Sequence, residues 1–224
     1  MKKIENKDLL NQYIKTNQIN QIFSSNLENA MDLFYFDKGE YICRESRKLD
    51  YLYFFLEGKA KTYSTLSNGK ALLLCFYSSF QIIGELELIS GNPITSNIQV
   101  VEPTYCIGIK IDLYRNLLLK DVTFLQYLCK GLSGKLARSS KNNSINLLYP
   151  LENRLSSYIY CTMEDNLFRC NLTELSELLG TSYRHLLRTI NQLCDKQIIQ
   201  RNKGYFNVID ESKLEELASE VYQN

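Results

Sequence analysis

The sequence predicts an α+β protein with an N-terminal β-roll or jelly roll, a long dimerisation helix and a C-terminal winged helix-turn-helix. Three observations lead to this fold class. The first half of the chain is filled with short β-rich runs separated by glycines, a long helical stretch without proline follows, and a glycine-separated helix pair with a hairpin pattern occupies the last third. We place the N-terminal helices and the roll at 1–111, the long helix at 112–146 and the winged helix-turn-helix at 150–224.

The pattern of the first part of the chain changes from helical spacing to β-rich runs at Leu33. Residues 4–31 carry apolar side chains at helical spacing, so we expect short helices there. The β-rich runs that follow are Leu33–Phe36, Tyr41–Cys43, Tyr51–Leu56, Ala60–Thr65, Ala71–Tyr77, Ile82–Ile83, Ile98–Val101 and Tyr105–Ile111. We expect turns at Gly39, Gly58, Gly69 and Gly91. Short strands at near-regular intervals favour an antiparallel roll over an alternating α/β fold, and such a roll can enclose a pocket.

The stretch 112–146 carries a coiled-coil seam. Its positions follow one another at steps of four and three residues, at Leu125, Cys129, Leu132, Leu136, Ser139 and Asn143. A monomer could bury this stripe against the roll, but paired recognition helices favour a homodimer with Leu125, Cys129, Leu132 and Leu136 at its interface. We expect the basic residues on the other faces to be solvated: Lys130, Lys135, Arg138 and Lys141. Pro150 marks a hinge before the next helix, over Leu151–Glu164.

Residues 171–193 have the pattern of two short helices joined by a tight turn. Asn171 can cap the first helix, and Gly180 ends it because glycine adopts the left-handed conformation without strain. Ser182 caps the second helix, whose inward face consists of Leu186, Leu187, Ile190 and Leu193. This pattern is typical of a helix-turn-helix, whose second helix lies in the DNA major groove, although an ordinary helical hairpin has the same apolar spacing.

The outward face of the second helix is basic, and so is the segment that follows it. The helix presents Tyr183, Arg184, His185 and Arg188, and the hairpin expected over 198–209 has Arg201, Asn202 and Lys203 at its tip. Five lysines or arginines within 180–204 accompany one acid, Asp195. The whole chain has a net charge of only +1, so this local concentration is what indicates contact with phosphate. A short helix at 211–222 closes the chain.

The sequence also speaks against several classes of protein. No apolar run approaches the ~18–20 residues that span a bilayer, and the N-terminus lacks the apolar segment of a signal peptide, so we expect a cytoplasmic protein without a membrane partner. Seven cysteines without a C-x-x-C pair and a single histidine predict no metal site. We expect the cysteines to act as small buried apolar residues rather than as a redox switch. No catalytic set or phosphate loop is present, so we expect no enzyme.

The order of these parts resembles the CRP/FNR superfamily, the regulators related to the cyclic-AMP receptor protein. The most specific residues are Gly84-Glu85-Leu86-Glu87-Leu88 and the string LGTSYRHLLRTINQL, which looks most like the YeiL-type branch. The resemblance covers about residues 30 to 210. It implies a cyclic-nucleotide-binding-like roll that acts as a sensor, a homodimer on a palindromic double-stranded operator, and contact with RNA polymerase.

The resemblance also implies where an effector would bind. In the cyclic-AMP-binding members a Gly-Glu pair meets the sugar, an Arg-Ser pair meets the phosphate and polar residues of the long helix meet the base. The corresponding residues here are Gly84, Glu85, Thr95, Ser96, Ser139 and Ser140. Thr95 stands where the arginine is expected, and a hydroxyl cannot replace the cation that a buried phosphate needs. We therefore expect no dependence on cyclic AMP, with Gly84-Glu85 serving as a structural turn.

Two cofactors known in the superfamily have no ligands here. No cysteine precedes Cys43, so the N-terminal iron–sulfur cluster of the oxygen-sensing members is not implied, and a haem ligand is not implied because the single histidine lies on the DNA-facing helix. We expect no cofactor, and the effector stays open.

The resemblance places the base-reading positions on Tyr183, Arg184 and Arg188, with Ser182 as a phosphate contact. His185, Arg201 and Lys203 complete the expected DNA-contacting set, although His185 could equally be a plain surface residue. The sequence thus predicts a homodimeric, sequence-specific DNA-binding regulator. The alternative is a small-molecule-binding roll whose C-terminal half mediates protein contacts.

Overall fold

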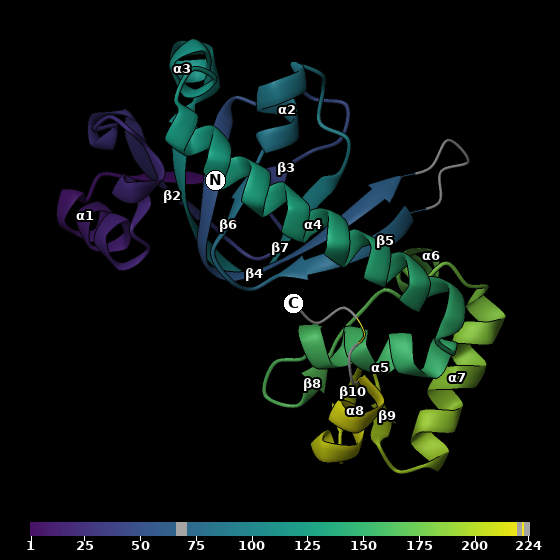
Figure 1. The fold of residues 1–224 in the computed structure, drawn as a ribbon. Helices are drawn as coiled ribbons and strands as arrows, with labels where there is room; N and C mark the ends of the chain where they lie inside the picture. Colours follow the sequence, from purple (N-terminus) through teal and green to yellow (C-terminus); the bar gives the residue numbers. More distant parts are fainter. Residues whose placement is uncertain (66–70, 219–220, 222–224) are drawn as a thin grey trace. The chain divides into compact units, whose positions relative to one another are not determined.

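The computed structural model describes residues 1–65, 71–218 and 221, with the backbone alone at 142, 143 and 145–147. The chain forms two compact units. The first contains residues 1–62 and 77–138, and the second contains residues 63–76 and 139–224. The predicted α+β class is confirmed, because two β-sheets, one of seven strands and one of three, occur together with α-helices (Figure 1).

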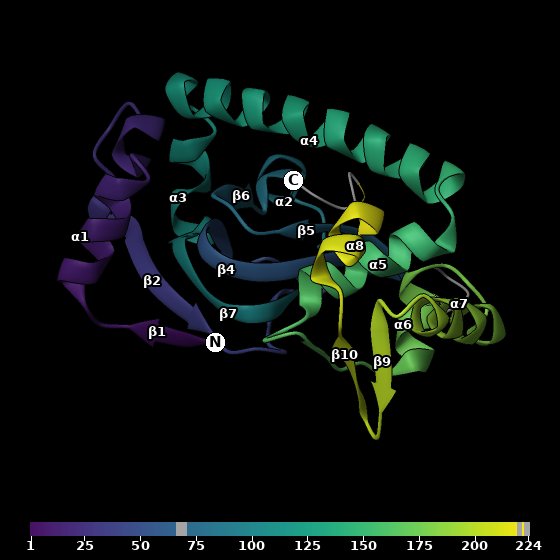
Figure 2. The ribbon, with the colours of Figure 1, turned by 90° about the horizontal axis from the view of Figure 1, so that it is seen from below.

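The strands of the first half curl into a roll, as predicted (Figures 1 and 2). They are β1 (Lys2–Ile4), β2 (Met31–Phe36), β3 (Tyr41–Cys43), β4 (Tyr51–Thr65), β5 (Ala71–Tyr77), β6 (Gln81–Ile83) and β7 (Asn97–Lys110). The main path of the sheet runs β1-β2-β7-β4-β5, while β3 also pairs with β7 and β6 with β4. β2 and β7 pair antiparallel over their whole common length, from Met31 opposite Ile109 to Phe36 opposite Thr104.

Two pairs of predicted strands are in fact single long strands. β4 unites 51–56 with 60–65, and β7 unites 98–101 with 105–110, while the last residue of the predicted run, Ile111, begins a helix. The prediction of a turn at Gly58 was therefore wrong. This residue has φ +102°, and a Cβ built on it would lie 2.4 Å from the carbonyl oxygen of Pro103, so glycine is needed for close approach of the two strands. Gly39 does occupy a turn with positive φ, whereas Gly91 is the left-handed C-cap of an unpredicted helix, Glu85–Ser90, and Gly69 lies outside the described residues.

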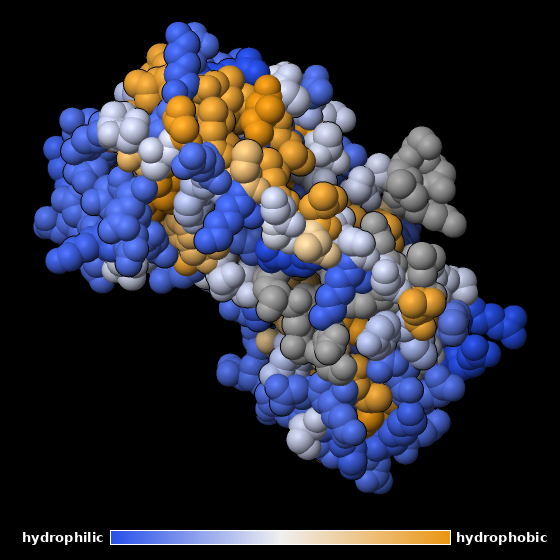
Figure 3. Space-filling view, in the orientation of Figure 1, coloured by the Kyte–Doolittle hydropathy of each residue, from blue (hydrophilic) through white to orange (hydrophobic). Residues whose placement is uncertain are grey.

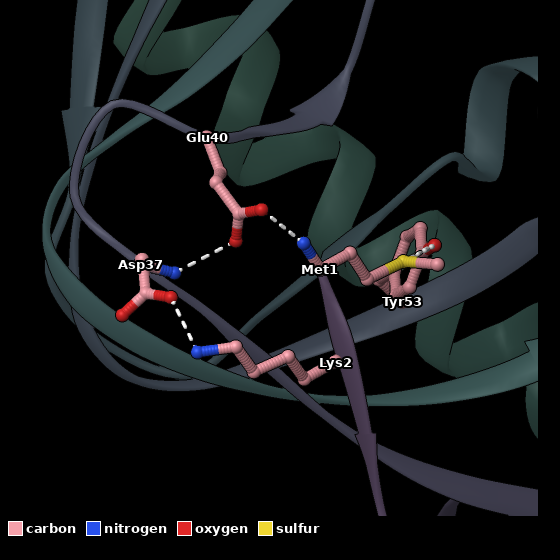
Figure 4. Close-up of polar contacts among 5 residues, drawn as sticks. All are labelled: Met1, Lys2, Asp37, Glu40 and Tyr53. Carbon is pink, nitrogen blue, oxygen red and sulfur yellow. Dashed lines mark hydrogen bonds and ion pairs between the residues drawn. The ribbon is translucent and has the colours of Figure 1, made fainter.

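Residues before β2 are mostly helical, as expected, in α1 (Lys7–Thr16) and two short 3-10 helices, Ile19–Ile22 and Glu28–Ala30. The preceding strand β1 was not predicted, because three residues are too few to show alternation. Figure 4 shows how its start is fixed: the Met1 amine meets Glu40, and the Lys2 ammonium lies 2.8 Å from an Asp37 carboxylate oxygen. Glu40 in turn accepts the Asp37 amide at 2.9 Å, closing a polar network around this edge.

The long helix predicted over 112–146 is two helices, α3 (Ile111–Leu118) and α4 (Val122–Leu148). Asp121 separates them, because its carboxylate accepts the amides of Phe124 at 3.1 Å and of Ser24 at 2.8 Å. This cap begins a new helix at α4. A further helix, α2 (Glu85–Ser90), was not predicted. The first half of α4 lies over β6 and α2 (Figure 2). Two of its own residues, Phe124 and Leu128, are buried.

The second unit contains the predicted winged helix-turn-helix. Its helices are α5 (Leu151–Thr162), α6 (Leu172–Leu178), α7 (Tyr183–Asp195) and α8 (Glu211–Ala218). The wing consists of β9 (Ile199–Asn202) and β10 (Tyr205–Val208), joined by an unpredicted third strand, β8 (Leu167–Phe168), in the order β8-β10-β9. The closing helix predicted to reach 222 is described as far as Ala218.

Candidate nucleic-acid interface and effector pocket

The turn between α6 and α7 has the three local features that the sequence indicated. The Asn171 side chain accepts the amides of Thr173 at 2.9 Å and Glu174 at 3.4 Å, and so caps α6. Gly180 has φ +60° just after α6 ends, and Ser182 Oγ accepts the His185 amide at 3.2 Å to cap α7. These contacts fix where α7 begins and therefore which residues form its first turn.

One support of this turn could not be read from the sequence. Arg154 of α5 donates from Nη1 to the carbonyl oxygen of Leu179 at 2.6 Å, which satisfies a carbonyl at the end of α6. The two residues are 25 positions apart, so no local pattern marks the contact.

The outward face of α7 consists of the predicted residues. The exposed residues are Ser182, Tyr183, Arg184, His185 and Arg188. The opposite, apolar face is buried and contains Leu186, Ile190 and Leu193. His185 Nδ1 lies 3.2 Å from Thr181 Oγ1. Tyr183 keeps 47% of its surface exposed although it is large and aromatic. Such a face of aromatic, cationic and capping groups at the start of a helix can donate hydrogen bonds to bases and phosphates. Its contact with DNA stays a prediction.

The wing carries two of the predicted basic residues in different settings. Lys203 and Gly204 form the two-residue connection of the hairpin, and Gly204 has φ +90°, a conformation that glycine adopts without strain. Arg201 was predicted at the tip but lies within β9, opposite Phe206. Both side chains are exposed. Lys196, counted in the same basic cluster, instead pairs with Glu152 at 2.6 Å.

The predicted effector pocket is formed in part. Gly84, Glu85, Thr95 and Ser96 line one cavity of about 80 Å³ in the first unit, together with Cys43, Thr62, Tyr77 and Lys135 among others. Ser139 and Ser140 do not line it; they are exposed and belong to the second unit. We call this cavity the effector pocket. Its volume is well below the ~300–1,000 Å³ of typical small-molecule sites.

The electrostatics of the effector pocket centre on a lysine that the sequence did not single out. Lys135 was predicted to be solvated, but its Nζ lies 2.7 Å from Glu85 Oε1 and 2.6 Å from the Ile82 carbonyl oxygen. Glu85 is only 5% exposed. Nearby, burial raises the pKa of Glu87 despite the Thr95 amide that favours its ionised form. The position of Lys135 depends on partners about 50 residues earlier, so helical periodicity could not reveal it.

Gly84 has the structural role that the sequence suggested. It takes φ +97°, and a Cβ there would lie 2.1 Å from Leu49 Cδ2. This glycine is therefore required by packing and backbone conformation alone.

The predicted dimer seam is partly accessible. Leu125 and Leu132 are half-buried, Cys129 is exposed and Leu136 is 74% exposed. Other apolar residues of the same unit are also exposed, including Leu113 on α3 and Val122 at the start of α4. Figure 3 shows apolar residues gathered over α3 and the first half of α4. The homodimer itself stays a prediction.

Other chemistry has little support in the part of the chain described. Among those residues, His, Cys, Asp and Glu side chains form no group of three that could hold a metal ion. Burial raises the pKa of the Cys43 and Cys106 thiols, which disfavours the reactive thiolate. None of the helices over the described ranges is both long and apolar enough to cross a bilayer.

Comparison with known proteins agrees with both halves of this geometry. The family model of the cyclic nucleotide-binding domain matches residues 33–121, and that of the Crp-like helix-turn-helix domain matches residues 148–217. The regulatory protein YeiL of Escherichia coli O157:H7 is 36% identical over 190 residues, which are 84% of this chain and 86% of that protein. The chain belongs to the CRP/FNR family of transcriptional regulators.

More distant relatives of this CRP/FNR protein show how widely the fold is shared. A CRP-like cAMP-activated global transcriptional regulator of Mycobacterium tuberculosis is 22% identical over 165 residues, covering 74% of this chain and 68% of that protein. A solved CRP/FNR-family structure from Eubacterium rectale has a TM-score of 0.74 at 13% identity, covering 85% of this chain and 91% of that one. A Thermus thermophilus regulator of the same family reaches 0.64 at 20% identity, covering 83% and 97%.

Proposed function

We propose that this CRP/FNR regulator acts as a homodimer that binds a palindromic operator in a sequence-specific way without cyclic AMP. The observation that carries the proposal is the exposed face of α7, where Tyr183, Arg184 and Arg188 follow the Ser182 cap. Arginine can donate two hydrogen bonds to guanine, and the cap sets the helix N-terminus where a phosphate can be bound. Ser182, His185, Arg201 and Lys203 are proposed as the accompanying contacts.

The homodimer is supported by the exposed apolar residues of α4. Leu136 and Val122 are 74% and 65% exposed, which is costly in a monomer but favourable in a helix-to-helix interface. Two copies related by a two-fold axis would present two recognition helices to two half-sites. We further propose that the dimer acts in the cytoplasm and, by its family resemblance, contacts RNA polymerase.

Independence of cyclic AMP is supported by the charges of the effector pocket. Thr95 supplies no positive charge, and the Lys135 ammonium is already bound to Glu85. An anionic phosphate in this pocket would lie near Glu85 and Glu87 without a free cation among the lining residues.

The test is fluorescence anisotropy of the purified protein on the DNA upstream of its own gene and on a scrambled duplex. Measurements are made at two salt concentrations, with and without added cyclic AMP. We expect sequence-preferring binding without cyclic AMP, with an affinity that falls steeply with salt and does not change when the nucleotide is added. A rise in operator affinity of tenfold or more on addition of cyclic AMP would contradict the proposal that binding does not depend on this nucleotide.

The competing function is a roll that binds a small molecule and a C-terminal half that contacts other proteins. It would be supported if the anisotropy showed only weak binding, equal on both duplexes, at every salt and nucleotide condition. The basic residues exposed on α7 and the wing favour DNA instead.

A further inference from the structure

The effector pocket contains a charged group of its own. Lys135 reaches in from α4 and donates to Glu85 Oε1 of α2 at 2.7 Å and to the Ile82 carbonyl oxygen of β6 at 2.6 Å. Its ammonium also lies 5.6 Å from the centre of the Tyr77 ring, within range of a cation–π interaction. Three separate segments of the roll therefore bind one side chain of the helix.

Because this ion pair is buried, removing one of its partners costs more free energy than it would at the surface. The Glu85 side chain is 7% exposed and that of Lys135 is 23% exposed. Removing one partner from such a pair leaves the other as an uncompensated charge away from water, which is strongly unfavourable. The carboxylate of Glu85, which would otherwise be free to bind a ligand, thus has a partner from the same chain.

We propose that the Lys135 ammonium is the built-in occupant of the effector pocket, and that the Glu85–Lys135 pair holds α4 on the roll in the absence of a ligand. A ligand bridging roll and helix is then unnecessary for fixing the position of α4. Because α4 continues into the unit that contains α7, the pair also keeps the recognition helices competent for DNA. Only this last consequence rests on the proposed function.

The helix itself is tested by hydrogen exchange measured on the full chain by mass spectrometry. The variants are Glu85→Gln, Lys135→Met and the double variant, with Lys130→Met as a matched control because Lys130 is an exposed lysine of the same helix outside the effector pocket. We expect amides of 122–138 to exchange about tenfold or more faster in Lys135→Met and Glu85→Gln, and at the wild-type rate in Lys130→Met. The double variant should lose less protection than the sum of the single changes, since neither charge is left unpaired.

Exchange in Lys135→Met equal to that in Lys130→Met would overturn the proposal, and so would strictly additive losses in the double variant. Both results are independent of DNA binding, and failure of the wild type to prefer its operator would count against the proposed function alone.

The consequence for DNA is tested with the same variants by operator anisotropy without any ligand. We expect Lys135→Met and Glu85→Gln to bind about tenfold or more weakly than wild type and Lys130→Met to bind within twofold of it. Faster exchange of 122–138 combined with unchanged operator affinity would mean that the Glu85–Lys135 pair only stabilises the packing of α4 on the roll. This result would overturn its link to the recognition helices.

Discussion

At the scale of single residues, Gly58 shows how a distant contact selects one amino acid. It lies inside β4 with φ +102°, and the space that a side chain would need is already taken by Pro103 and Thr104 of β7. Gly39 has a similar φ of +86°, but nothing lies within 4 Å of the position of its Cβ. The two glycines therefore separate the cost of backbone strain from the cost of a steric clash.

We predict that Gly58→Ala lowers the free energy of unfolding by about 2–4 kcal/mol, the sum of ~1 kcal/mol of left-handed strain and ~1–3 kcal/mol of overpacking. Gly39→Ala should lose only the strain component, about 1 kcal/mol. Urea unfolding followed by circular dichroism measures both values. Equal losses in the two variants would show that β4 and β7 can separate at no cost.

The exposed arginines of α7 allow a second prediction at this scale. Arg184→Ala and Arg188→Ala should each weaken operator binding by about 1–3 kcal/mol and relax the preference at one base position. Arg47→Ala, which removes an exposed arginine of the first unit, is the matched control and should leave affinity unchanged. Competition against duplexes substituted at single base pairs reads out the preference. If affinity falls equally on every duplex, the arginines contact phosphate only.

At the scale of elements, helix ends depend on short-range signals that the sequence displays. Asn171, Gly180 and Ser182 could be assigned correctly because each acts on residues within four positions of itself. Gly58 and Lys135 could not be assigned, because their roles depend on partners about 50 residues away. The apolar periodicity of the sequence likewise continues past Asp121 without a break. The start of α4 is visible only from the hydrogen bonds that the Asp121 carboxylate accepts from the amides of Ser24 and Phe124.

The cap at Asp121 predicts a dependence on pH. Burial alone would raise the pKa of its carboxyl, but the amides of Ser24 and Phe124 outweigh burial and hold the pKa below its usual value. A depressed carboxyl pKa stabilises the fold above the unfolded pKa of ~3.9, and this contribution is lost as the pH falls through the folded pKa.

We therefore expect Asp121→Ala to lower the free energy of unfolding by about 1–2 kcal/mol at pH 7, with a gap to wild type that narrows below about pH 4. Urea titrations at pH 7 and at pH 3.5 measure this gap. Asp8→Ala, at an exposed aspartate of α1, should show a much smaller effect at both pH values. A gap that stays the same at both would contradict the assignment.

At the scale of the whole molecule, α4 carries apolar side chains that the single chain leaves exposed, among them Val122 and Leu136. Leu136→Glu places a charge in the proposed dimer interface, and we predict that it raises the dimer dissociation constant at least about tenfold and weakens operator binding in parallel. Sedimentation equilibrium measures the association. Lys130→Glu places the same carboxylate off the seam, with a charge change of −2 instead of −1, and should leave the dimer intact. A wild-type chain that stays monomeric at all concentrations would contradict the homodimer.

The composition of the second unit has a consequence for how the protein is made. Residues 63–76 belong with residues 139–224, and the ring of Phe76 packs 5.9 Å from that of Tyr158, which is 82 positions further along the chain (76 to 158). During synthesis, Phe76 leaves the ribosome well before its aromatic partner exists. The ring contact between Phe76 and Tyr158 can therefore form only after the chain has been synthesised past Tyr158, so this part of the second unit is completed late in translation.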